Sequence, residues 1–238
     1  MFLRKTSLLL LFIITTAELK AQSSIGLETG LSAGYLNTNI ANRTSSRITY
    51  RLGYSIAIPF KYQLNKWLSV ETDPGILQKN YSISRTDSLS GAYTSFINTY
   101  LQLPVMAKAI LFHKKKLMFF ANAGFYYGYW MAAKQKGKEP DIFTATQSNN
   151  SSGQTTSTIQ YAGFDQKYTI NEQIDNRSEW GWILGLGVQK QINERYIAYA
   201  AFRMYESFTQ QQKNYMINQI PQYNEILDLS VGVMVLLK

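Results

Sequence analysis

The clearest strand pattern of the sequence lies near the C-terminus and reads Leu227-Asp228-Leu229-Ser230-Val231-Gly232-Val233-Met234-Val235-Leu236-Leu237. Every odd position in this segment is apolar, whereas the even positions mix polar, small and apolar residues. Side chains of a β-strand alternate between its two faces, so a period of two predicts a strand with one uniformly apolar face. The length matches a tilted strand that crosses a bilayer, which needs about 9–11 residues.

Three other segments repeat the alternation. Residues 50–62 and 180–188 place large apolar side chains at the even positions, and residues 97–111 place them at most odd positions. A soluble periplasmic β-protein is the alternative, but soluble strands usually have only about five or six residues. No segment reaches about 18 consecutive apolar residues, which excludes a spanning helix. A chain that spans lipid without helices must form a closed barrel, because lipid offers no partners to the backbone.

We therefore predict an all-β fold in which residues 22–238 form a transmembrane antiparallel up-and-down β-barrel. Eight strands are expected near 25–36, 49–62, 67–83, 93–111, 117–133, 177–191, 195–208 and 224–237. Short connections alternate with long polar ones, as in outer-membrane barrels, so both termini are expected in the periplasm and the long loops outside the cell. The loop 134–176 contains a strand-like part, residues 158–170. It either forms a hairpin above the membrane or adds two strands, so ten strands are the alternative.

Residues 1–21 have the pattern of a cleaved secretory signal peptide. Arg4 and Lys5 precede an apolar run over residues 8–14, and Ala21 supplies a small residue for cleavage. The run is too short to span a bilayer as a helix. The chain has no cysteine, which excludes disulfides, thiolate metal sites and a lipidated cysteine. These features predict export to the bacterial outer membrane.

With the apolar faces turned outward, nine charged residues point into the barrel. They are Glu28, Arg51, Lys61, Glu71, Asp73, Lys108, Glu179, Arg203 and Asp228. These five acids and four bases nearly cancel, although the whole chain carries a net charge of +9. An eight-stranded barrel is just wide enough to be filled by side chains, and charges buried there must be paired. We interpret the nine residues as a structural ion-pair network that blocks the lumen, in preference to a conducting or ligand-binding path.

Aromatic residues mark two expected membrane borders. The outer girdle is predicted to contain Tyr50, Tyr93, Tyr127, Tyr129, Trp180 and Tyr205, and the periplasmic girdle Tyr62, Trp67 and Tyr196. Basic residues of the outer loops are expected to contact outer-membrane lipid and the phosphates of lipopolysaccharide. They are Arg43, Arg47, Arg85, Lys134, Lys136 and Lys138.

No residue pattern indicates catalysis or a cofactor. The chain has one histidine, His113, in a predicted periplasmic turn without a plausible nucleophile partner. Clustered histidine metal ligands are unavailable, and no acidic loop has calcium-loop spacing. We therefore expect no catalytic, cofactor-binding or metal-binding residue. Nothing resembles a nucleic-acid-binding module, and export argues against a nucleic-acid partner.

A family resemblance follows from short motifs along the chain. The run Tyr100-Leu101-Gln102-Leu103-Pro104-Val105, followed by Lys108, resembles the central strand of the PorT-like outer-membrane β-barrel family of Bacteroidetes. Residues 30–35, the glycine-rich strand 180–187 and the Ala21-Gln22 junction are similar to the same family. The resemblance implies an eight-stranded outer-membrane barrel without enzymatic activity, and its namesake belongs to the type IX secretion machinery.

Two hypotheses on function remain. The first is a non-enzymatic structural or interaction barrel that presents its outer loops to partners. The second is transport, either as a narrow pore or as a secretion-associated, PorT-like component that contacts other envelope or secretion-machinery proteins.

Overall fold

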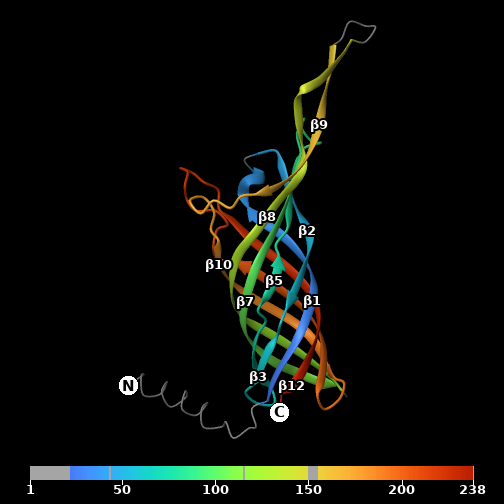
Figure 1. Cartoon of the computed structure of the whole chain (residues 1–238), viewed down its shortest axis with the longest axis vertical. Coiled ribbons are helices and arrows are strands. Elements are labelled where there is room, and N and C mark those ends of the chain that lie inside the picture. Colours follow the sequence, from blue (N-terminus) through green and yellow to red (C-terminus); the bar gives the residue numbers. More distant parts are fainter. Residues whose placement is uncertain (1–21, 43, 115, 150–154, 238) are drawn as a thin grey trace.

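The computed structural model describes residues 22–42, 44–114, 116–149 and 155–237, and the predicted signal peptide over residues 1–21 lies outside these ranges. The described residues form one antiparallel sheet closed into an elongated barrel (Figure 1). Its strands are β1 (Ser23–Thr38), β2 (Ser46–Ala57), β3 (Phe60–Gln63), β4 (Leu68–Thr72), β5 (Gly75–Gln78), β6 (Tyr81–Arg85), β7 (Tyr93–Lys114), β8 (Leu117–Asn149), β9 (Thr155–Tyr168), β10 (Ser178–Gln191), β11 (Tyr196–Ser207) and β12 (Gln222–Leu237). One short 3-10 helix, η1 (Asn39–Asn42), follows β1. Over the described ranges, no helix is long and apolar enough to cross a membrane.

The barrel closes because its first and last strands pair along their whole length. β1 and β12 are antiparallel from the pair Ser23–Leu237 to the pair Thr38–Gln222. Around the wall, β1 is followed by β2 with β3, then by β4, β5 and β6, and then by β7, β8, β10, β11 and β12. All of these pairings are antiparallel, so the predicted all-β antiparallel barrel is confirmed.

The sheet contains twelve strands, where the sequence predicts eight with ten as the alternative. Two of the predicted strands are interrupted. Pro59 separates β2 from β3 and Pro74 separates β4 from β5, because proline has no N–H to donate to a sheet ladder. The predicted strand 67–83 is interrupted once more, between β5 and β6. This break lies at Lys79, whose backbone N–H donates to the carbonyl of Asn98 at 2.9 Å. β2 and β3 together fill the place of one predicted strand, and β4, β5 and β6 fill the place of another. The wall therefore has the eight predicted strand places, and β9 is additional.

β8 is longer than predicted and leaves the barrel wall. Its outer part pairs with β9, from Ala133–Tyr168 to Asn149–Thr155. β9 pairs with β8 alone, and the resulting hairpin projects beyond the barrel (Figure 1). Of the two alternatives for the loop 134–176, the hairpin is therefore correct and the additional wall strands are not.

The outward face of the wall is strongly apolar. Leu27, Leu52 and Phe125 are 69%, 71% and 65% exposed, and they belong to an apolar surface contributed by every position around the wall. A continuous apolar surface of this size is unfavourable in water. It is typical of strands that face the hydrocarbon of a membrane.

The inward face is filled by aromatic rings that lie across glycines of the neighbouring strand. Tyr199 of β11 pairs with Gly232 of β12, and Phe120 of β8 pairs with Gly187 of β10. A Cβ atom on Gly232 would lie 2.5 Å from the Tyr199 ring, and one on Gly187 would lie 2.3 Å from the Phe120 ring. Only glycine leaves room for these rings, which occupy the lumen instead of the outer surface.

Candidate functional site

The centre of the lumen holds a cluster of five charged residues, which we call the Arg203 cluster: Arg203, Glu28, Glu71, Asp73 and Lys108. Arg203 is 1% exposed and reaches across the lumen from β11. Its Nη1 donates to Glu28, and its Nη2 lies 2.9 Å from Oε2 of Glu28. The same Nη2 lies 2.9 Å from Oδ2 of Asp73 and 3.6 Å from Oε1 of Glu71. Lys108 donates to Oε2 of Glu71 at 2.8 Å.

These contacts tie together four parts of the wall. The cluster takes residues from β1, β4, β7 and β11, and Asp73 follows β4 directly. Tyr199 adds a neutral donor, since its hydroxyl bonds Oε2 of Glu28 at 2.7 Å. A buried ion pair is strongly destabilised when one partner is lost. The cluster therefore holds opposite walls of the barrel in one arrangement and fills the space between them.

A second buried ion pair lies further along the lumen, between Lys79 and Glu179. Tyr126 donates to Glu179 at 2.7 Å, and Asn224 donates to its other oxygen at 2.6 Å. The Lys79 ammonium lies 4.6 Å from the centre of the Tyr100 ring and 4.5 Å from that of Tyr126, where cation–π attraction adds to the pair. Its side chain is fully buried.

Lys79 is the inward charge that the sequence analysis missed. It has the same parity as Glu71 and Asp73 on the preceding strands, so its alternation already indicated an inward position. With Lys79, the inward-facing acids and bases named above number five each.

An apolar layer separates the two charged sites. Its members are Leu77, Met106, Tyr126, Ile183, Tyr205 and Ile226, all buried and in mutual contact. On β7, Met106 lies between Gln102 and Lys108, and on β12, Ile226 lies between Asn224 and Asp228. The lumen of the described barrel therefore alternates charged and apolar layers along its axis.

The remaining predicted inward residues have different surroundings. Asp228 is buried and accepts a hydrogen bond from Ser55 at 2.7 Å. Arg51 is half-buried near the hairpin end and donates to Ser95 at 2.8 Å. Lys61 is 4% exposed, and its ammonium has no hydrogen-bond or ion-pair partner among the described residues. The structure thus brings Glu28, Glu71, Asp73, Lys108 and Arg203 together but leaves these three apart from that cluster.

Most of the predicted girdle residues lie on the outward face. Tyr50, Tyr62, Trp67, Tyr93, Trp180 and Tyr196 are exposed, and Tyr127 and Tyr129 are half-buried. The ring centres of Tyr127 and Trp180 lie 4.9 Å apart, and Arg177 lies 5.0 Å from the centre of the Tyr129 ring. Tyr205 is different and corrects the prediction. It is 6% exposed inside the barrel, because it shares the inward parity of Arg203 two residues earlier.

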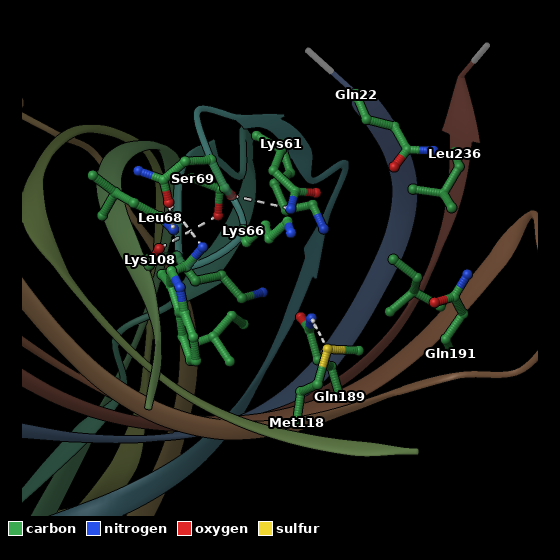
Figure 2. Close-up of a pocket in the computed structure, with 15 residues that line it drawn as sticks. Gln22, Lys61, Lys66, Leu68, Ser69, Lys108, Met118, Gln189, Gln191 and Leu236 are labelled. Carbon is green, nitrogen blue, oxygen red and sulfur yellow. Dashed lines mark hydrogen bonds between the residues drawn. The ribbon is translucent and has the colours of Figure 1, made fainter. Parts of the chain in front are cut away.

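Each end of the lumen contains a cavity. At the hairpin end, a cavity of about 250 Å³ is lined by Tyr81, Phe96, Trp130 and Tyr168 among others. Two loops cross above it, since Asn176 donates its N–H to the carbonyl of Gln211 at 3.0 Å and Asp175 bridges to Gln212. Burial, together with the Asp175 carboxylate, raises the pKa of Tyr168 to about 12. At the end where the termini lie, a second cavity of about 180 Å³ opens between the walls (Figure 2).

His113 lies at the exposed end of β7, where its ring meets the edge of Trp67 at 5.8 Å between centres. The described ranges contain no group of three or more His, Asp or Glu side chains placed to hold a metal ion. Most charged groups of the described lumen contact one another, and three of its carboxylates also accept hydrogen bonds from buried hydroxyls: Glu28 from Tyr199, Glu179 from Tyr126 and Asp228 from Ser55.

Three solved structures of known proteins are similar to this chain at low sequence identity and with TM-scores below 0.5. The outer membrane protein OprG from Pseudomonas aeruginosa is 11% identical with a TM-score of 0.48, over 92% of this chain and 97% of that chain. Neisserial surface protein A is 10% identical with a TM-score of 0.42, over 89% and 96% of the two chains. Ail, the attachment invasion locus protein of Yersinia pestis, is 12% identical with a TM-score of 0.38, over 90% and 99%. The comparison with curated proteins gives no match.

The family comparison covers most of the chain. A model described as the outer membrane protein beta-barrel domain matches residues 20–211. This range includes every strand from β1 to β11. It contains the Arg203 cluster and the Lys79–Glu179 pair, whereas Asn224 of β12, which bonds Glu179, lies outside it. The protein accordingly belongs to the outer membrane protein beta-barrel domain family and is a β-barrel of the bacterial outer membrane.

Proposed function

We propose that the protein is a non-enzymatic barrel with a filled lumen that anchors in the outer membrane and presents its long loops to partners. The observation that carries this proposal is the layered interior. Arg203 and Met106 are each 1% exposed, and Lys79 is fully buried, although they lie at three successive levels of the lumen. Water or ions would have to break two buried ion pairs and cross an apolar layer to pass, and each of these steps is unfavourable.

The lengths of the connections support the orientation that we propose. Three short connections, from β3 to β4, from β7 to β8 and from β10 to β11, lie at the end of the barrel where β1 begins and β12 ends. The β8–β9 hairpin and the loops 169–177 and 208–221 lie at the other end. Barrels of this membrane have short periplasmic turns and longer extracellular loops. We therefore place the termini in the periplasm and the hairpin outside the cell.

A column of lysines supports contact with lipopolysaccharide. Lys134, Lys136 and Lys138 are exposed on one face of β8, beyond the girdle residue Tyr129 on the same strand. Lys134 pairs with Asp165 at 2.8 Å, which leaves Lys136 and Lys138 for phosphate groups. Arg47 is exposed and Arg85 is half-buried near the same end, whereas Arg43 lies outside the described residues.

Conductance in planar bilayers tests the filled lumen. The purified mature chain should produce no stable single-channel openings, because the Arg203 cluster and the Lys79–Glu179 pair occlude the path. Stable, ion-selective openings would contradict the proposal. A heat-modifiable gel shift on the same preparation shows that the barrel is folded, so that silence cannot result from unfolded protein.

Transport is the second candidate, and the two end cavities favour it. They lie at opposite ends of one lumen, so a path would exist if the layers between them rearranged. The resemblance of residues 100–105 to PorT-like barrels of Bacteroidetes supports a secretion-associated form of this role. Co-purification of secretion-machinery proteins with the intact barrel, dependent on the hairpin or the loops, would favour it over the anchoring role.

A further inference from the structure

The cavity at the end where the termini lie is rich in donors. Its lining contains Lys61, Lys66 and Lys108 together with the side-chain amides of four glutamines and one asparagine. Among the described residues, no carboxylate belongs to the lining. Figure 2 shows Lys61, Lys66 and Lys108 gathered on one side, with Gln189 and Met118 across the cavity from them. The described lining therefore offers a ligand ammonium and amide donors, together with neutral acceptors from the amide oxygens.

Lys61 is the feature without an explanation inside the protein. It pairs in register with Glu71 of β4, so a carboxylate stands directly opposite it on the neighbouring strand. Lys108 bonds one oxygen of that carboxylate at 2.8 Å, whereas the other oxygen lies 3.6 Å from Arg203 and has no hydrogen-bond partner. Within the described ranges the Lys61 ammonium has no hydrogen-bond or ion-pair partner, although only 4% of the residue is exposed. An unpaired charge at this depth is costly unless something compensates it.

A neighbouring donor is also poorly satisfied. Gln189 is 5% exposed, and its amide nitrogen has the sulfur of Met118, 3.7 Å away, as its hydrogen-bond partner. Thioether sulfur is a weak acceptor. Two buried donors from opposite walls, Lys61 of β3 and Gln189 of β10, thus line the same cavity and lack a strong acceptor.

We propose that this cavity binds a phosphate group. Lys108 is bonded to Glu71, which leaves Lys61 and Lys66 as the lysines of the lining without an ion pair among the described residues. A phosphate monoester carries about −1.5 to −2 charges near neutral pH and offers three acceptor oxygens. The volume of about 180 Å³ holds one such group with a few waters, at about 30 Å³ for each water. The group comes either from a soluble phosphate or from a lipid headgroup at the rim.

Titration calorimetry with inorganic phosphate tests the site. The mature chain is folded in a phosphate-free non-ionic detergent and titrated at constant ionic strength. Lys61→Met should weaken binding by about tenfold or more, since a charge-assisted hydrogen bond contributes at least that factor. Lys190→Met is the matched control, because Lys190 is exposed on β10 outside the cavity and its loss changes the net charge equally. Its affinity should remain within about twofold of the parent.

A second arm separates the two sources of phosphate. Thermal unfolding is compared in phosphatidylcholine vesicles with and without phosphatidic acid. Stabilisation by phosphatidic acid that Lys61→Met abolishes and Lys190→Met keeps would support the site with a lipid source, even when free phosphate does not bind. Absence of binding in both arms, or equal losses in the two variants, would overturn the proposal.

Folding of the variants is checked by heat-modifiable mobility. If Lys61→Met does not fold, Lys66→Gln takes its place, because Lys66 is exposed in the turn between β3 and β4 and tolerates substitution. Lys66→Gln should weaken phosphate binding several-fold relative to Lys190→Gln. Equal affinities of these two variants would overturn the proposal.

Discussion

Replacing Arg203 by methionine tests whether the Arg203 cluster holds the barrel together. Methionine keeps an unbranched side chain but removes the guanidinium, which contacts Glu28, Asp73 and Glu71. After the substitution, three buried carboxylates share the centre of the lumen, and Lys108 remains bonded to Glu71 alone. Neither Glu28 nor Asp73 has another cationic partner within ion-pair distance in the described part of the chain.

The expected magnitude follows from this geometry. Removing one partner of a buried ion pair costs roughly 3–5 kcal/mol, because the remaining charge stays uncompensated. Arg203 is 1% exposed, so solvent screening does not reduce this figure much. We therefore expect Arg203→Met to lower the free energy of unfolding by roughly 3–5 kcal/mol.

Urea unfolding in lipid vesicles, followed by tryptophan fluorescence, measures this change. Arg195→Met is the matched control, since Arg195 is exposed in the turn before β11 and should shift the free energy by no more than about 0.5 kcal/mol. Combining Arg203→Met with Glu28→Gln should recover part of the loss, with a coupling energy of about 0.5–3 kcal/mol. An Arg203→Met variant as stable as the Arg195→Met control would refute the reasoning.

Three further predictions use the same preparations. Lys79→Met should lower the free energy of unfolding by roughly 3–5 kcal/mol, because it leaves Glu179 with neutral partners, and adding Glu179→Leu should recover part of this loss. A double variant no more stable than the single one would contradict this prediction. Tyr205→Ala removes a member of the apolar layer and should cost roughly 3–5 kcal/mol, clearly more than Tyr50→Ala on the outward face. Equal losses would show that both side chains have the same environment. Replacing residues 141–159 by a short turn should leave the heat-modifiable gel shift intact, because β9 pairs with β8 alone; loss of the shift would show that the hairpin is needed for closure.

Much of the wall could be predicted because membrane strands obey a local rule. Alternation along 227–237 and 50–62 separates the lipid-facing side chains from the inward ones, and the structure exposes Leu229, Val231 and Val233 as this pattern requires. Burial of the charged residues Glu28, Glu71 and Arg203 follows from the same parity. The breaks at Pro59 and Pro74 were not predicted, since the expected strands 49–62 and 67–83 run through both prolines, and Pro104 lies within β7 without ending it.

Two errors arose where this rule was not applied throughout. Tyr205 was assigned to the girdle because tyrosine is common there, although its parity matches that of Arg203. Lys79 shares the odd parity of Glu71 and Asp73, so the same rule indicates its inward position although it lies between β5 and β6. Residue type is a weaker guide than register when a side chain has both an apolar ring and a polar tip.

The all-β class, the positions of the eight wall segments and the inward parity of the charges follow from the amino-acid order, because each depends on spacing within one strand. The tertiary structure alone decided which charges meet, since Arg203 contacts residues from β1 and β4 that are more than a hundred positions away. It also decided that β9 stays outside the wall and that Lys61 meets no hydrogen-bond or ion-pair partner among the described residues beside the cavity. Those outcomes depend on the register between strands and on competition for a shared carboxylate, and neither is written in the spacing of a single segment.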